Sequence, residues 1–135
     1  MLSEGATFID IGAYSSKPSA EFVTEAEEIE RIVPVIELIL KHFPEALLSI
    51  DTFRSKIAKA SIESGAAIIN DIAAGELDNK MFDVIAKYNV PYIMMHMRGN
   101  PQTMQSMTQY EDIVKEILFY FSEKVKKART LGIND

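Results

Sequence analysis

The sequence predicts an α/β fold in which four strand–helix units build one parallel sheet. Four short, largely apolar runs alternate with segments of helical periodicity, and most of these runs end in a polar residue. Near-continuous apolar runs are typical of strands buried on both faces, as in a parallel sheet with right-handed crossovers. The expected strands lie within residues 6–12, 47–51, 66–71 and 90–96.

The first helix is expected to run from a cap at Thr24 to about Lys41. Thr24 and Glu27 have the spacing of a capping box, and the acidic start and basic end suit the helix dipole. Pro34 lies inside this helix and should bend it.

Three further helices are expected, over residues 54–64, about 78–88 and from Thr108 onward. Thr108 and Glu111 again have capping-box spacing, and Gly132 is a plausible stop. One apolar stripe should run along the last helix. Its members are Ile113, Val114, Ile117, Leu118, Phe121, Val125 and Leu131.

Composition excludes several classes of function. The 135 residues suit one domain, and a net charge of −6 argues against nucleic-acid and anionic-membrane partners. The absence of Cys rules out disulfides, thiolate metal sites and a Cys nucleophile. No apolar stretch approaches the ~18 residues needed to span a bilayer. The first residues lack a signal-peptide pattern, so we expect a cytoplasmic protein.

Polar residues stand at or near the carboxyl ends of the predicted strands, where parallel α/β folds bind ligands. The two long loops, 12–23 and 97–107, belong to the same edge. Each polar residue also has a simpler interpretation as a helix cap, turn former, backbone acceptor or core histidine. The set comprises Asp10, Asp51, Asn70, Asp71 and His96.

Such a set suits recognition of a flat, nitrogen-rich ring. A carboxylate accepts two parallel N–H bonds from an amidine-like edge, and an Asn can both donate and accept. Ile72 and Met95 lie near enough in sequence to cover the ring faces, whereas Met94 is better explained as core. The hydroxylic and basic loop around Ser15 and Lys17 could hold a phosphate, although it lacks a P-loop glycine pattern.

Five motifs together resemble the dihydropteroate synthase family, in that family's order and spacing. The similarity covers nearly the whole chain, and the last two motifs are the most specific. The motifs are Asp10-Ile11-Gly12, Ser15-Ser16-Lys17-Pro18, Ser49-Ile50-Asp51-Thr52, Ile69-Asn70-Asp71-Ile72 and Met95-His96-Met97-Arg98-Gly99-Asn100-Pro101.

The resemblance implies a (β/α)₈ barrel that joins 4-aminobenzoate to 6-hydroxymethyl-7,8-dihydropterin diphosphate and releases pyrophosphate with Mg²⁺. By resemblance, two polar residues would bind the pterin edge, and two apolar residues would line its pocket. A loop would order over pyrophosphate, with Ser16 and Lys17 as its catalytic members. The edge residues are Asp51 and Asn70, the pocket residues Ile72 and Met95, and the loop residues Ser15, Ser16, Lys17 and Pro18.

The chain departs from the family pattern in two places. Ser16-Lys17 stands where Thr-Arg is usual, and Lys lacks the bidentate fork of Arg, so anion contacts should differ. Tyr14 replaces a common Glu.

A closed (β/α)₈ barrel needs ~250 residues, so we expect 1–135 to be a partial domain matching barrel strands two to five. The strand whose Asn meets Mg²⁺ in the family would lie outside it. We therefore expect no turnover by the chain alone, and self-association into a homo-oligomer that covers its open edges. The alternatives are the pterin-binding domain of a methyltetrahydrofolate–corrinoid methyltransferase, a non-catalytic pterin-binding module, and a structural fragment without a ligand.

Overall fold

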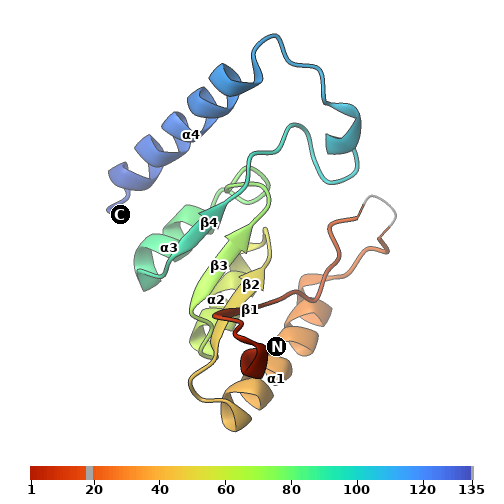
Figure 1. Ribbon diagram of the computed structural model, residues 1–135, viewed down its shortest axis with the longest axis vertical. Coiled ribbons are helices and arrows are strands. Elements are labelled where there is room, and N and C mark those ends of the chain that lie inside the picture. The colour runs from red at the N-terminus through yellow and green to blue at the C-terminus, as the bar shows by residue number, and fades with distance from the viewer. Residues whose placement is uncertain (18–19, 135) are drawn as a thin grey trace.

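The computed structural model describes residues 1–17 and 20–134 and contains one sheet of four parallel strands in the order β1-β2-β3-β4 (Figure 1). The strands are β1 (Phe8–Ile11), β2 (Leu47–Asp51), β3 (Ile68–Asp71) and β4 (Tyr92–Met94). The α-helices are α1 (Glu25–His42), α2 (Ser55–Glu63), α3 (Met81–Tyr88) and α4 (Ile113–Thr130), and the 3₁₀ turns are η1 (Leu2–Glu4) and η2 (Met104–Ser106). The predicted α/β class with four parallel strands is confirmed.

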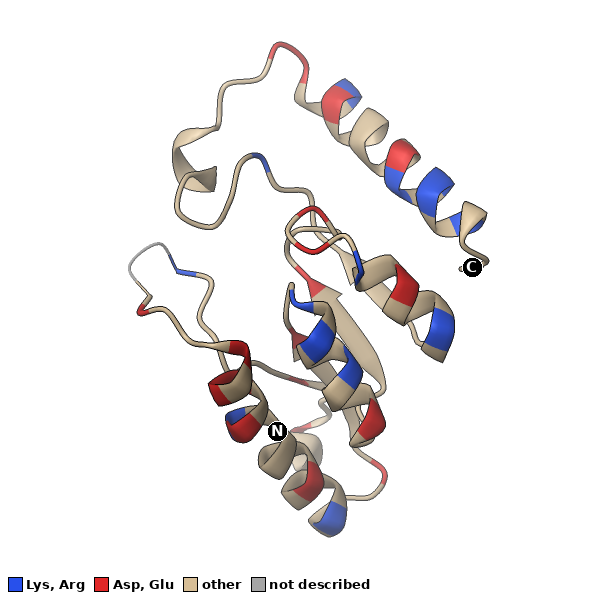
Figure 2. Cartoon of the chain, turned by 180° about the vertical axis from the view of Figure 1, so that it is seen from behind, with Lys and Arg blue, Asp and Glu red and all other residues tan. Residues whose placement is uncertain are grey.

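Helices α1, α2 and α3 lie side by side over one face of the sheet (Figures 1 and 2). Side chains alternate between the faces of a strand, so one set of sheet residues packs against these helices. Leu48, Ile50 and Ile69 belong to this set and are fully buried. The helices contribute Ile32, Ile36, Ile57, Ala58, Met81 and Ile85 to the same core.

No helix covers the opposite face of the sheet in the described part of the chain. Apolar side chains at this inner face remain open to solvent, with Phe8 51%, Leu47 43% and Ile93 50% exposed. Partners in register place these residues on one face, since Phe8 pairs with Leu47 and Ile93 pairs with Asn70. One face of the sheet is therefore covered by helices, and the other face is open to solvent.

The N-terminus of α1 agrees with the predicted cap. The Thr24 hydroxyl accepts a hydrogen bond from the backbone N–H of Glu27 at 3.2 Å, while the Glu27 carboxylate binds Arg31 instead of completing the capping box. The helix continues through Pro34, whose side chain faces solvent.

The predicted start of the last helix is wrong. Helix α4 begins at Ile113, and its cap is Asp112, whose carboxylate accepts from the backbone N–H of Lys115 at 3.0 Å. Thr108 lies four residues ahead of that cap in a non-helical segment. Arg98 donates to the carbonyl of Gln109 at 2.5 Å, and this tertiary contact holds the chain outside the helix.

Helix α4 stands apart from the other three helices (Figure 1). Much of its predicted apolar stripe faces solvent, with Val114 64% and Leu118 65% exposed. It contacts the rest of the fold along its length, since Tyr120 donates to the Ala73 carbonyl, Lys124 pairs with Glu76, and Ala128 is buried. The stripe thus predicts the helix correctly, and part of it is exposed in the structure.

Two further features concern a buried hydroxyl group and the apolar character of the helices. Among the described residues, one buried side-chain polar atom, the Ser61 hydroxyl of α2, has no hydrogen-bond partner. In the described part of the chain, no helix combines the length and the apolar character that crossing a membrane requires.

Candidate functional site at the carboxyl ends of the strands

Three of the predicted polar residues meet on the open face of the sheet. Asp51 ends β2 and is the register partner of Asn70 in β3, while Asp10 lies in the adjacent strand β1. The Asn70 amide nitrogen donates to the Asp10 carboxylate at 3.3 Å. These side chains come from strands far apart in sequence, and the parallel register brings them to one edge. Their predicted convergence is confirmed.

Asp51 occupies an unfavourable environment for a negative charge. Burial raises the pKa of its carboxyl, and the neighbouring carboxylates Asp10 and Asp71 raise this pKa further. The simpler interpretation of Asp51 as a helix cap is wrong, because the Asp78 carboxylate accepts from the first backbone N–H of α2, that of Ser55, at 2.7 Å. Asp51 therefore has no such structural duty at the start of α2.

Asp71 does not join this cluster. It faces the helices, is completely buried and accepts hydrogen bonds from the backbone N–H groups of Ala73 and Gly75, both at 2.8 Å. The Tyr92 hydroxyl also donates to it at 2.6 Å. The expectation that Asp71 shares the ligand surface is wrong, since side chains alternate along β3 and Asn70 already faces the open side. Turn formation is its role.

The predicted anion loop borders Asp51. A cavity of about 710 Å³ is lined by Ser15, Ser16 and Lys17 together with Asp51. The Ser15 hydroxyl accepts from the backbone N–H of Lys17 at 3.3 Å, which orders this turn. Pro18, the fourth predicted loop residue, lies outside the described residues.

Gly12 explains how the loop comes so close to Asp51. A Cβ atom at Gly12 would lie 3.1 Å from the Asp51 carbonyl oxygen and 3.2 Å from its Cβ. A larger residue would force the start of the loop away from β2. The glycine of the Asp10-Ile11-Gly12 motif thus permits close contact between loop and strand end.

The predicted apolar residues lie beside the cluster rather than in the cavity with Asp51. Ile72 is half-buried directly after β3, and Met95 is 38% exposed after β4. Neither lines the cavity that Asp51 shares with the loop. The Met95 backbone N–H donates to the Asp71 carbonyl at 3.1 Å and so fixes the end of β4 beside β3.

His96 does not reach the carboxylates. Its ring contacts Tyr120 edge to face with centroids 4.8 Å apart, and it also lies 6.1 Å from the Tyr110 ring. Burial raises the pKa of Tyr120 to about 12, so its hydroxyl is neutral near pH 7. The interpretation of His96 as a packing residue therefore fits better than that of a ligand.

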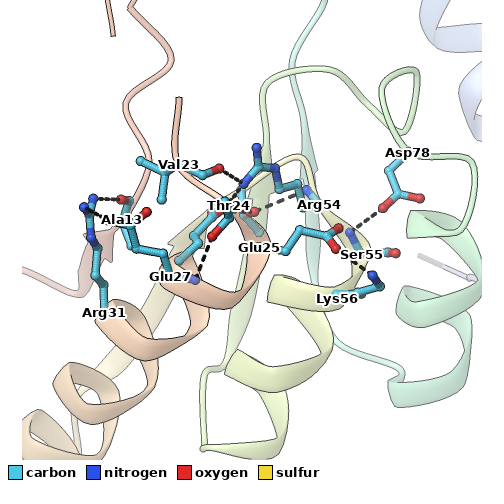
Figure 3. Close-up of polar contacts among 12 residues, drawn as sticks. Ala13, Val23, Thr24, Glu25, Glu27, Arg31, Arg54, Ser55, Lys56 and Asp78 are labelled. Carbon is cyan, nitrogen blue, oxygen red and sulfur yellow. Dashed lines mark hydrogen bonds and ion pairs between the residues drawn. The ribbon is translucent and has the colours of Figure 1, made fainter. Parts of the chain in front are cut away.

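Two charged residues near the starts of α1 and α2 were missed by the sequence-based prediction, and one of them, Arg54, is labelled in Figure 3. Glu28 of α1 is 1% exposed and pairs with Arg54, which precedes α2, at 2.6 Å. Burial raises the pKa of the Glu28 carboxyl, and the hydrogen bond from Arg54 opposes that rise. The spacing of Glu28 with the buried Ile32 and Ile36 is a helical stripe, and this was the signal that could have revealed its burial.

The described residues contain no group of three or more acidic or His side chains able to hold a metal ion.

Comparison with known proteins agrees with the geometry of this edge. The family described as "Pterin binding enzyme" matches residues 1–135. The mitochondrial folate synthesis bifunctional protein of Arabidopsis thaliana is 44% identical over 98% of this chain and 25% of its own length. Dihydropteroate synthase of Escherichia coli is 38% identical over 98% of this chain and 46% of its own length.

Solved structures show the same similarity. The Yersinia pestis dihydropteroate synthase in complex with a sulfonamide drug matches with a TM-score of 0.90 and 36% identity, covering 98% of this chain and 47% of that one. The four strand–helix units thus correspond to part of a TIM barrel, and the chain spans half or less of the length of these relatives. The chain belongs to the pterin binding enzyme family.

Proposed function

We propose that the protein represented by this chain is a dihydropteroate synthase, and that these residues supply the strand ends that bind the pterin. The observation that carries the proposal is the pairing of Asp51 with Asn70 in register beside the Ser15–Lys17 loop. The similarity to dihydropteroate synthases, of whose length this chain covers about half, supports the proposal.

Each residue of the cluster has a definite part in this proposal. The Asp51 carboxylate accepts two N–H bonds from the amidine-like edge of the pterin, because such bidentate pairs are strong. The Asn70 amide contacts the next ring atoms, and Asp10 orients that amide through the 3.3 Å hydrogen bond. Ile72 and Met95 provide apolar contacts at the rim of the ring.

The reaction needs no nucleophilic side chain. The C–O bond between the pterin methylene and diphosphate breaks, and the amine nitrogen of 4-aminobenzoate forms a C–N bond to the same carbon and then loses a proton. Lys17 and the hydroxyl of Ser16 stabilise the charge of the departing pyrophosphate, as preorganised donors do. Positive character left on the methylene delocalises into the ring that Asp51 holds.

Mg²⁺ is proposed only as a companion of the diphosphate, because the described residues form no metal cage. No step of this chain's chemistry is assigned to it. A cytoplasmic location and a homo-oligomeric state are further parts of the proposal, and cell fractionation and sedimentation test them.

Calorimetry with 6-hydroxymethyl-7,8-dihydropterin diphosphate tests pterin binding. We expect Asp51→Asn to weaken binding at least about tenfold, since loss of a charge-assisted pair costs roughly 1.5–3 kcal/mol. Asp83→Asn, an exposed carboxylate of α3, is the matched control and should bind as the wild type does. Equal affinity of Asp51→Asn and wild type would refute the assignment.

Turnover is a separate question, since this chain aligns with only 47% of a solved synthase. We expect the purified 135-residue chain to bind the pterin without forming dihydropteroate. Product formation by this chain alone, detected by chromatography, would overturn that expectation.

A further inference from the structure

We propose that Arg54 is a positioning residue. It fixes the first long loop, which carries Ser15, Ser16 and Lys17, against the start of α2. The proposal rests on the function proposed above only for the substrate contacts of that loop. It rests on contacts that bring the beginning and the end of the loop to one guanidinium group, and Figure 3 shows the contact with Val23 at the end.

The guanidinium is itself held from the helix side. Arg54 Nη1 donates to Glu28 Oε2 at 2.6 Å, and the two side chains are only 13% and 2% exposed. The Thr52 hydroxyl donates to the other Glu28 oxygen at 3.4 Å and accepts from the Arg54 backbone N–H at 3.2 Å. A buried carboxylate requires its partner, so this pair fixes where the guanidinium lies.

The loop contacts the same guanidinium group. Nη1 of Arg54 also donates to the Val23 carbonyl at 2.8 Å, at the end of the loop. The guanidinium carbon lies 4.6 Å from the centroid of the Tyr14 ring, at the beginning of the loop, and 5.6 Å from that of Phe22. A cation over an aromatic face is attracted at such distances. One residue therefore binds the loop at both of its ends.

Tyr14 and Phe22 also contact each other edge to face, with centroids 6.4 Å apart. The Phe53 ring lies 5.8 Å from Tyr14 and completes an aromatic wall around Arg54. The Tyr14 ring makes the shortest of the contacts between Arg54 and these aromatic rings.

Arg54 also lines a cavity together with residues of the candidate site. A cavity of about 380 Å³ is lined by Ser15, Ser16 and Arg54 on one side and by Asn100 and Gln102 of the second long loop on the other. Displacement of the first loop from Arg54 would move the two hydroxyl groups in this cavity. If the Glu28–Arg54 ion pair served stability alone, its loss would not move these two hydroxyl groups selectively.

Backbone ¹⁵N relaxation at residues 13–17 and 20–23 tests the proposal. Arg54→Lys keeps a charge beside Glu28 but loses the planar fork, and Tyr14→Leu removes a ring from the loop side. In both variants we expect loop order parameters to fall below about 0.6 from roughly 0.8, while those of β2 stay unchanged. Lys56→Met is the matched control, because Lys56 pairs with Glu25 across the same helix ends without contacting the loop.

Unchanged loop order parameters in Tyr14→Leu would overturn the proposal. An equal loss of order in the loop and in β2 would also overturn it, since it would indicate a general structural role for the pair. Tyr14→Leu leaves the Glu28–Arg54 pair intact, so it decides the question if Arg54→Lys fails to fold. Failure of the wild type to bind the pterin would refute the proposed function and leave this relaxation result standing.

Discussion

At the scale of single residues, Asp51 combines a chemical role with an energetic penalty. Its carboxylate stands half-buried beside Asp10, and both burial and like charges disfavour its ionised form. A residue selected for stability alone would not be charged here, because its neighbours supply no cation in the described contacts. A ligand with N–H donors on one edge would supply hydrogen bonds that stabilise this carboxylate.

The raised pKa of Asp51 leads to a prediction about pH. In the function proposed above, pterin binding requires the ionised carboxylate, so affinity should be present above the pKa of Asp51 and be lost as the pH falls through it. Because this pKa is raised, the loss should begin at a higher pH than for an ordinary Asp. Asp10→Asn removes one cause of the rise and should move the midpoint of affinity to lower pH.

Calorimetric titrations between about pH 8 and about pH 4 would measure this midpoint. Asp83→Asn again serves as control, with the midpoint of the wild type. A midpoint that stays in place in Asp10→Asn would contradict the electrostatic explanation.

The residues that were predictable from sequence are those whose role follows from strand ends. Asp51 and Asn70 each terminate an apolar run, and a parallel sheet must bring such positions together. Glu28 and Arg54 were not predictable as a pair, because their contact joins α1 to the start of α2 and depends on how the helices pack. Asp71 was misplaced because neighbours in a strand point to opposite faces.

At the scale of elements, the four strands and four helices follow from periodicity, whereas helix ends depend on local competition. Thr108 and Asp112 are both good cap residues by type. Asp112 caps α4 because Arg98 holds the chain before it through the carbonyl of Gln109. That tertiary contact was not visible in the sequence.

Asp112→Ala should therefore weaken α4, whereas Thr108→Ala should not. Loss of an N-cap hydrogen bond costs about 1 kcal/mol, with a range of roughly 0.5–2. Hydrogen exchange of amides in the first turns of α4 should accelerate accordingly in Asp112→Ala. The prediction fails if Thr108→Ala accelerates exchange as much as Asp112→Ala does.

At the scale of the whole molecule, the sheet has one open face and two strands, β1 and β4, that each pair on one side only. Exposed strand edges and apolar side chains favour association. Three large apolar residues of the open face are 43–51% exposed, namely Phe8, Leu47 and Ile93.

We expect the chain to self-associate through this open face. Sedimentation velocity should show species larger than a monomer at high protein concentration, and the double variant Phe8→Lys with Leu47→Lys should shift the chain toward monomer. Leu38→Lys is the control, because Leu38 is 58% exposed on α1, away from the sheet. A compact monomer for the wild type at high concentration would contradict this prediction.

The unpartnered hydroxyl of Ser61 has a consequence for adaptation and for engineering. A buried donor without a partner destabilises a fold by about 1–3 kcal/mol, and Ala is also the better helix former. Ser61→Ala should raise the thermal midpoint, whereas Ser64→Ala should not, because the Ser64 hydroxyl donates to the Ala60 carbonyl at 2.9 Å. Removal of one oxygen atom from α2 would thus allow the fold to tolerate destabilising substitutions at the charged site beside the strand ends.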